Sequence, residues 1–251
     1  MRILRILSFL LLLTLVVFLP DLLKSSVIGR SFAYSPSGTP KEVYTGDGVR
    51  VLRSNNFDIY VFDAKKHRFG VSTSRPSGKR FYMNANFFTE PPHVKPMGLV
   101  VEDGRRRSPA LTRGGSFYVV GGLADVRRGP CPSGVRHAAQ TILWGIDDGK
   151  VNRGLLSSSR SRFLTYRNLV GRNRRGDIVF IVSHFGGVVR MKDVVDEGIR
   201  QGLMEALPFD AGTSVEYAFR DGGHSRSFTA ISDLSKAIVG IGRPVSYMYV
   251  E

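Results

Sequence analysis

Short runs of alternating apolar and polar residues dominate the chain after residue 48. Such alternation predicts β-strands, because it places one face of each strand on a core. Strands are expected at 57–62, 69–73, 81–83, 98–102, 117–120, 141–144, 164–170, 177–183 and 245–250. We expect 57–62 to pair with 69–73, and 164–170 with 177–183. Residues 177–183 are apolar almost throughout, which predicts a buried central strand, and the glycine- and proline-containing stretch 121–135 predicts a loop.

Helical periodicity is clearest over residues 191–207. One apolar stripe at helical spacing contains Met191, Val194, Val195, Ile199, Leu203 and Leu207. Gly198 and Gly202 weaken this helix, so it should depend on packing against a sheet. A shorter helix is expected at 232–238. Many strands with one or two helices predict an α+β fold, with a mixed or mainly antiparallel sheet, one main packed helix and a shorter one.

The N-terminus has the layout of a targeting segment. Arg2 and Arg5 precede an apolar run at 6–19, which is typical of a signal peptide or an uncleaved membrane anchor, and we favour the anchor. Either form places the rest of the chain in the periplasm or outside the cell. The chain is therefore divided into a signal peptide or anchor, a linker rich in Ser, Gly, Pro and Thr, and one folded domain: 1–23, 24–48 and 49–251.

The positive net charge of the chain predicts an anionic binding partner. The 251 residues carry a formal net charge of +15, which favours binding to anionic envelope polymers, sugar-phosphate glycans or lipid head groups. Nucleic acid is not expected, because no platform of interleaved basic and aromatic residues is present. Cys131 is the single cysteine, so paired-cysteine metal sites are excluded. No set of residues has metal-ligand spacing, and we predict no obligatory metal or cofactor. The oligomeric state stays open.

One stretch combines a strand end with residues that can perform chemistry. The apolar residues 217–219 are followed by polar and flexible ones: Asp221, Gly222, Gly223, His224 and Ser225. Paired glycines let the backbone approach a ligand closely, and successive N–H groups in such a turn can bind an anion. The alternative is an ordinary turn. A second polar group, Asn84 and Asn86, follows the predicted strand 81–83.

Four blocks resemble, in order, the phosphodiester glycosidase domain family. Met83–Phe88 resembles the family's Asn-Ala/Gly-Gly-Phe-Phe segment, and Pro96–Gly104 resembles Pro-x-Gly-Leu-x-Val-x-x-Gly. Arg167–Gly171 resembles Arg-Asn/Thr-x-x-Gly, and Asp221–Ser225 resembles the signature Leu-Asp-Gly-Gly-Gly-Ser. The blocks span 83–227, and the predicted long helix lies between the last two, where the family has one.

The chain departs from the family pattern at several positions. Asn86 and His224 stand where the family usually has glycine, and Arg220 stands where an apolar residue usually precedes the acid. The segment Pro208–Glu216 is longer than the family's link between helix and strand. These departures lie inside the expected site.

The resemblance implies an exported hydrolase that cleaves a sugar-1-phosphodiester, in an envelope or extracellular glycan. Such a reaction needs a cationic or N–H-rich pocket for phosphate and a carboxylate for proton transfer or charge stabilisation. Arg167 would bind the phosphate, Asp221 would be the catalytic carboxylate, and His224 would donate a proton. Substrate binding would fall to Asn84, Asn86, Gly222, Gly223 and Ser225.

Each assignment has a structural alternative. Asp221 can be a turn cap, Arg167 a surface arginine, and His224 a glycine replacement in a non-catalytic relative. The alternative for the whole protein is a non-catalytic module that binds glycans or anionic envelope polymers. The hydrolase hypothesis predicts that four side chains converge on one cleft: Asn84, Arg167, Asp221 and His224. The natural sugar and its aglycone stay open.

Overall fold

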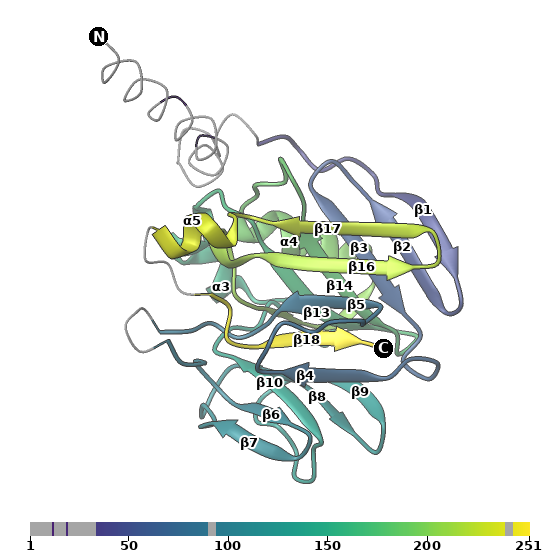
Figure 1. The fold of residues 1–251 in the computed structure, drawn as a ribbon, viewed down its shortest axis with the longest axis vertical. Helices are drawn as coiled ribbons and strands as arrows, with labels where there is room; N and C mark the ends of the chain where they lie inside the picture. The colour runs from purple at the N-terminus through teal and green to yellow at the C-terminus, as the bar shows by residue number, and fades with distance from the viewer. Residues whose placement is uncertain (1–11, 13–18, 20–33, 90–93, 239–242) are drawn as a thin grey trace, which may run out of the picture.

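The computed structural model describes residues 12, 19, 34–89, 94–238 and 243–251. Three β-sheets form its framework (Figure 1), and every strand pairing among these residues is antiparallel. The large sheet has eight strands, in the order β1 (Lys41–Gly46), β2 (Val49–Arg53), β3 (Phe57–Phe62), β14 (Ile178–Ser183), β13 (Asn168–Asn173), β15 (Leu203–Pro208), β11 (Ile146–Asp147) and β12 (Lys150–Val151). The fold is therefore sheet-rich and antiparallel.

Two five-stranded sheets accompany the large one. The second sheet has the order β17 (His224–Thr229), β16 (Glu216–Asp221), β5 (Phe81–Asn84), β18 (Tyr247–Val250) and β4 (Phe69–Ser72). The third has the order β7 (Arg105–Ser108), β6 (Val100–Glu102), β10 (His137–Thr141), β8 (Gly115–Val120) and β9 (Leu123–Arg128). The helical segments are α3 (Arg153–Ser157), η1 (Ser159–Arg162), α4 (Met191–Arg200), η2 (Gly212–Ser214) and α5 (Asp233–Ile238).

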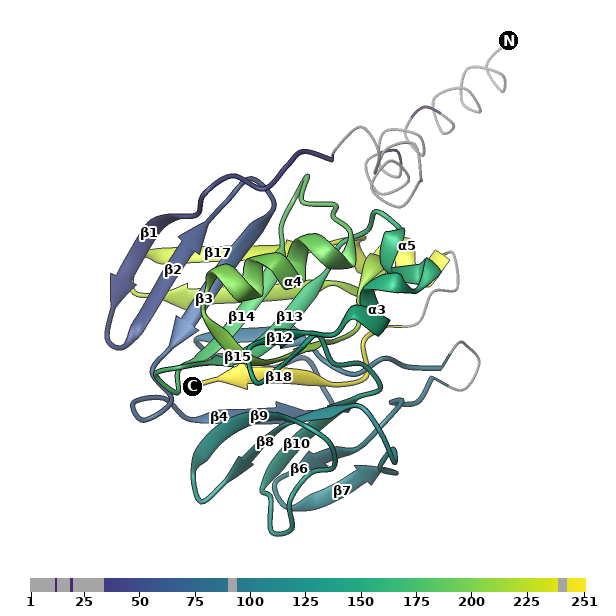
Figure 2. The same cartoon turned by 180° about the vertical axis from the view of Figure 1, so that it is seen from behind.

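An aromatic core joins the large sheet to the second sheet. Phe180 of β14 meets Phe81 of β5 with ring centroids 4.7 Å apart. Tyr60 of β3 lies 4.8 Å from Phe81 and 5.1 Å from Phe219 of β16. Both views show the second sheet on one face of the large sheet and α4 on the other (Figures 1 and 2). This layering buries both faces of β14, as its continuous apolar sequence predicted.

The helix α4 is shorter than the apolar stripe predicted. Met191, Val194 and Val195 are buried against the large sheet, but the helix ends at Arg200. Gly202 follows with φ of +72°, the left-handed conformation that commonly ends a helix. The expected second half of the helix is wrong, because Leu203–Pro208 forms the strand β15.

Several other predicted elements can be compared with the structure. The strand 57–62, the pairing of β13 with β14, the short helix α5 and the final strand β18 are confirmed. The expected pair 57–62 with 69–73 is wrong, because β3 pairs with β2 and β14, and β4 pairs with β18. The expected loop 121–135 contains β9, the expected strand 141–144 lies mostly beyond the end of β10, and the expected linker contains β1.

The apolar N-terminal run lies almost entirely outside the described residues. Among the described residues, no helix is long and apolar enough to cross a membrane.

Candidate functional site

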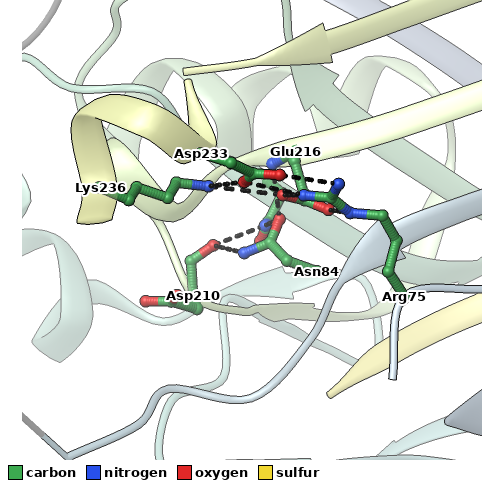
Figure 3. A network of polar contacts seen from close by, with 7 residues as sticks. Arg75, Asn84, Asp210, Glu216, Asp233 and Lys236 are labelled. Carbon is green, nitrogen blue, oxygen red and sulfur yellow. Dashed lines mark hydrogen bonds and ion pairs between the residues drawn. The ribbon is translucent and has the colours of Figure 1, made fainter. Parts of the chain in front are cut away.

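The buried side chain of Asn84, at the end of β5, joins two segments that lead into the second sheet. Its amide nitrogen donates to the carbonyl oxygen of Asp210 at 3.0 Å. Its amide oxygen accepts from the backbone N–H of Glu216 at 3.1 Å. One side chain thus connects the segment after β15 to the first residue of β16 (Figure 3).

Asn168, the first residue of β13, holds the same segment from the large sheet. Its amide nitrogen donates to the carbonyl oxygen of Asp210 at 2.6 Å, and its amide oxygen accepts from the N–H of Phe209 at 3.1 Å. The N–H of Asp210 in turn donates to the carbonyl of Ala85 at 2.9 Å. The backbone of Asp210 is therefore fixed where the large and second sheets meet.

The carboxyl group of Asp210 is the most strongly perturbed carboxyl group here. Asp210 is 7% exposed, and burial raises the pKa of its carboxyl to about 7, although Ser214, the N–H of Ala211 and the Lys236 ammonium act in the opposite direction. Its Oδ2 atom finds no hydrogen-bond partner among the described residues. A carboxyl that titrates near neutral pH, with one oxygen unengaged, can give or accept a proton during catalysis.

A second buried carboxylate, Glu216, lies at the start of β16 and is neutralised by two cations. Arg75 binds it through two nitrogens, at 2.7 and 2.8 Å, and the ammonium of Lys236 lies 3.4 Å away. Glu216 and Lys236 are 1% and 0% exposed. Arg75 also binds Asp233 of α5 at 3.0 Å, which lowers the pKa of that carboxyl. The network fixes α5 beside Asn84 and Asp210 (Figure 3).

Arg167 is a buried cation without a carboxylate partner among the described residues. It is 8% exposed, and burial lowers the pKa of its guanidinium to about 10. One terminal nitrogen donates to the carbonyls of Arg160 and Phe163, each at 3.1 Å, and its Nε has no partner. Its position in the chain, directly before Asn168, brings its backbone to the site. Its guanidinium turns towards the α3–η1 segment and retains capacity for an anion.

The glycine-rich hairpin lies at the far end of β16. Asp221 is five residues beyond Glu216 and forms a register pair with His224, which separates its backbone from that of Glu216 by roughly 16 Å along the strand. Asp221 lies 3.6 Å from Arg80, and the His224 ring stacks near Tyr44 at 4.8 Å. The expected convergence of Asp221 and His224 with Asn84 and Arg167 is therefore wrong.

The other residues of the hairpin and the second asparagine have structural surroundings. Gly222, with φ of +56°, and Gly223 form the exposed turn, and Ser225 is exposed on β17. Asn86 donates to the carbonyls of Gln140 and Leu99 at 2.6 and 3.3 Å, and its oxygen accepts from Ser246 at 3.0 Å. Of the expected site residues, the structure brings only Asn84 and the backbone of Arg167 to the Asp210 segment.

Asp210 has a motif-level signal that the sequence comparison missed. Residues 209–214 read Phe-Asp-Ala-Gly-Thr-Ser, which places Asp, Gly and Ser where Leu-Asp-Gly-Gly-Gly-Ser has them. The segment directly follows β15, the strand after α4. The long link Pro208–Glu216 and the unusual Arg220 are both consistent with an alignment of the signature at Asp210. Glu216 and Lys236 carry no such signal, because only the fold buries them together.

Two surface pockets and the single thiol are other features of the described residues that could form a site. Two surface pockets of about 270 and 490 Å³ lie at the other end of β3 and β14, and Asp63, Arg175 and Asp177 line both. Burial raises the pKa of the Cys131 thiol to about 11, so the thiol is protonated at neutral pH and unsuited to nucleophilic attack. Among the described residues, no three His, Cys, Asp or Glu side chains are grouped to hold a metal ion.

Comparison with known proteins supports the fold. No protein-family model matches the sequence, and no curated protein matches it. A hypothetical protein from Synechocystis is similar in structure, with a TM-score of 0.58 and 13% identity. The match covers 86% of this chain but only 64% of the Synechocystis chain.

Two further solved structures are also similar. One is the catalytic domain of zebrafish N-acetylglucosamine-1-phosphodiester alpha-N-acetylglucosaminidase, auto-inhibited by its pro-peptide. It has a TM-score of 0.55 and 14% identity over 85% of this chain and 83% of that one. The other is a Burkholderia pseudomallei protein whose name describes it as exported. It has a TM-score of 0.52 and 10% identity, and the match covers 80% of this chain and 74% of that one. The chain shares their fold.

Proposed function

We propose that the protein is an exported hydrolase that cleaves the bond between a sugar's anomeric carbon and a phosphodiester. The observation that carries this proposal is the buried Asp210 carboxyl, whose Oδ2 atom has no partner among the described residues and whose backbone is held by Asn84 and Asn168. Burial raises the pKa of this carboxyl to about 7. Structural similarity to a phosphodiester glycosidase catalytic domain supports the reaction class. An envelope or extracellular glycan is the proposed source of substrate.

The proposed chemistry depends on the carboxyl group of Asp210. Breaking the bond from C1 to the phosphate oxygen sends the electron pair to the phosphate and leaves positive charge on the sugar ring. A phosphate leaving group needs little protonation, so the proton to be managed is that of the attacking water. We assign both the removal of this proton and the stabilisation of the ring charge to ionised Asp210, because Glu216 is neutralised by Arg75 and Lys236. Phosphate binding is assigned to Arg167, whose guanidinium would have to turn from the carbonyl groups of Arg160 and Phe163 towards Asp210.

The test compares two aspartates that both follow the family signature. The chain, Asp210→Asn and Asp221→Asn are incubated with a sugar-1-phosphodiester that carries a chromogenic aglycone. Asp210→Asn should lose about 10²- to 10⁴-fold in turnover, as expected for removal of a general base, and Asp221→Asn should retain activity. Loss of activity only in Asp221→Asn would contradict this assignment and identify the β16–β17 hairpin as the active site. In the parent, kcat/KM should fall as pH drops below about 7, because protonated Asp210 cannot accept a proton.

A second candidate is a non-catalytic module that binds glycans or anionic envelope polymers. One observation favours it: the Oδ2 atom of Asp210 has less than 1 Å² of exposed surface, so substrate would have to reach a closed site. This candidate predicts salt-sensitive binding of acidic polymers and no turnover by any variant.

A further inference from the structure

One stretch of the chain is basic and contains no acidic residue. Residues 150–167 contain four arginines and one lysine, and no Asp or Glu. Arg153, Arg160 and Arg162 in and around α3 and η1 are exposed. No described carboxylate lies within ion-pair distance of these three arginines. Their charge is therefore available to an anionic partner.

Two aromatic side chains project at the same end of the domain. Phe163, directly after η1, is 65% exposed, and Phe185, in the turn between β14 and α4, is 71% exposed. They are the most exposed large apolar side chains in the described part of the chain. Their two segments are joined by an antiparallel bridge between Thr165 and Val189. Exposed aromatic residues beside unpaired arginines are typical of surfaces that rest at a lipid interface.

The N-terminal part of the chain is fastened at this end. Asn56 donates to the carbonyl of Ser35 and to the hydroxyl of Ser37, each at 2.8 Å. The guanidinium of Arg190, at the start of α4, lies over the Tyr34 ring at 5.4 Å. Figure 2 shows the chain entering the domain beside the β14–α4 turn and the segment after α3.

The apolar run that predicts a membrane anchor ends close to this attachment in the sequence. Residues 20–33 separate the apolar run 6–19 from Tyr34. A spacer of that length reaches at most about 50 Å when fully extended. An anchored domain would therefore stay near the bilayer, with the fastened end closest to the point of attachment.

We infer that this end of the domain docks on an anionic phospholipid surface. The docking surface, here called the tether face, consists of Arg160, Arg162, Phe163, Phe185 and Arg190. The arginines bind lipid phosphates, and the phenylalanines enter the head-group region. Docking fixes the orientation of the domain on the membrane. The inference is independent of the proposed reaction, because none of these side chains belongs to the Asp210 site.

The test reports the environment of one tether-face position in the full chain. An environment-sensitive fluorophore is attached to Phe163→Cys in a Cys131→Ser background, and the chain is inserted into vesicles of phosphatidylcholine alone or mixed with phosphatidylglycerol. Emission should shift to the blue in the mixed vesicles only, and added salt should reverse the shift. Arg160→Gln and Arg162→Gln should each lower the ratio of docked to undocked domain about fivefold.

Matched controls decide between the outcomes. The same label on Leu123→Cys, which is 55% exposed in the β8–β9 turn, should stay in water in both vesicles. Flotation of the chain with both kinds of vesicle verifies attachment. Equal emission of the Phe163 label in the two vesicles would overturn the inference. A blue shift on adding a soluble acidic polysaccharide, without anionic lipid, would assign the surface to a polymer and also overturn it.

Discussion

Replacing Asp210 by asparagine should change how stability depends on pH. The folded protein holds the Asp210 proton up to a pKa of about 7, whereas the unfolded chain releases it near 3.8. Between these values the folded state binds more protons, so the parent loses stability as pH rises through this window and no more above it. The difference corresponds to about 4 kcal/mol, at about 1.4 kcal/mol for each pH unit. Asparagine cannot ionise and escapes this loss.

The variant also carries a cost that does not depend on pH. Its amide N–H groups take the place of Oδ2, which has no partner in the described part of the chain, and an unsatisfied buried donor costs about 1–3 kcal/mol. Asp210→Asn should therefore be less stable than the parent at about pH 4. At about pH 8 it should be more stable, because the parent's loss of about 4 kcal/mol exceeds this cost.

Urea denaturation of both proteins at several pH values measures the pH at which their unfolding free energies become equal. The informative quantity is the difference in unfolding free energy as a function of pH, because the fixed cost cancels from its slope. Asp148→Asn is the control, since that side chain is 77% exposed and its φ of +51° suits asparagine. Parallel stability curves for the parent and Asp210→Asn from about pH 4 to pH 8 would refute the burial argument.

Three further predictions follow from the polar network. Phosphate at a hundredfold excess over its dissociation constant should stabilise the parent by about 2.7 kcal/mol but not Arg167→Met; equal thermal shifts in both proteins would exclude Arg167 as the anion site. Glu216→Gln should cost about 3–5 kcal/mol in urea denaturation because Lys236 stays buried and charged; adding Lys236→Met should recover most of it, and no recovery would contradict the pairing. Asn86→Ala should cost about 1–3 kcal/mol of stability and leave turnover per folded molecule intact, whereas Asn84→Ala should lower turnover. Equal losses of turnover in the two variants would show that Asn84 has no special role at the site.

Local pattern predicted most elements of the fold but not their partners. The alternating run 57–62 is a strand because its side chains face two cores, and that is visible in the sequence. Its pairing with β14, more than a hundred residues away, is not visible, because register between distant strands depends on the whole core. The end of α4 was predictable from Gly202, whose left-handed backbone stops the helix while the apolar spacing continues into β15.

The site was harder to predict because its chemistry depends on burial. Asp221-Gly222-Gly223 matches the family signature more literally than Asp210-Ala211-Gly212. Residue identity alone therefore favoured an exposed turn. What distinguishes Asp210 is the pair of asparagines that hold it, one 126 positions away and the other 42. Sequence motifs carry no information on such contacts, and both aspartates follow the helix α4 in the chain, so chain order alone does not separate them.

The distribution of satisfied and unsatisfied polar groups separates scaffold from chemistry. Asn84, Asn86 and Asn168 are buried, and each uses its amide to hold backbone groups in place. Asp210 and Arg167 are also buried, yet Oδ2 of one and Nε of the other have no partner among the described residues. A structural role at either position would be met better by a neutral side chain, because a buried ionisable group costs stability unless something compensates it. For Asp210, Ser214, the N–H of Ala211 and Lys236 offset part of this cost, and for Arg167 two carbonyl groups do. Under the proposed function, a bound sugar phosphodiester would supply the remainder.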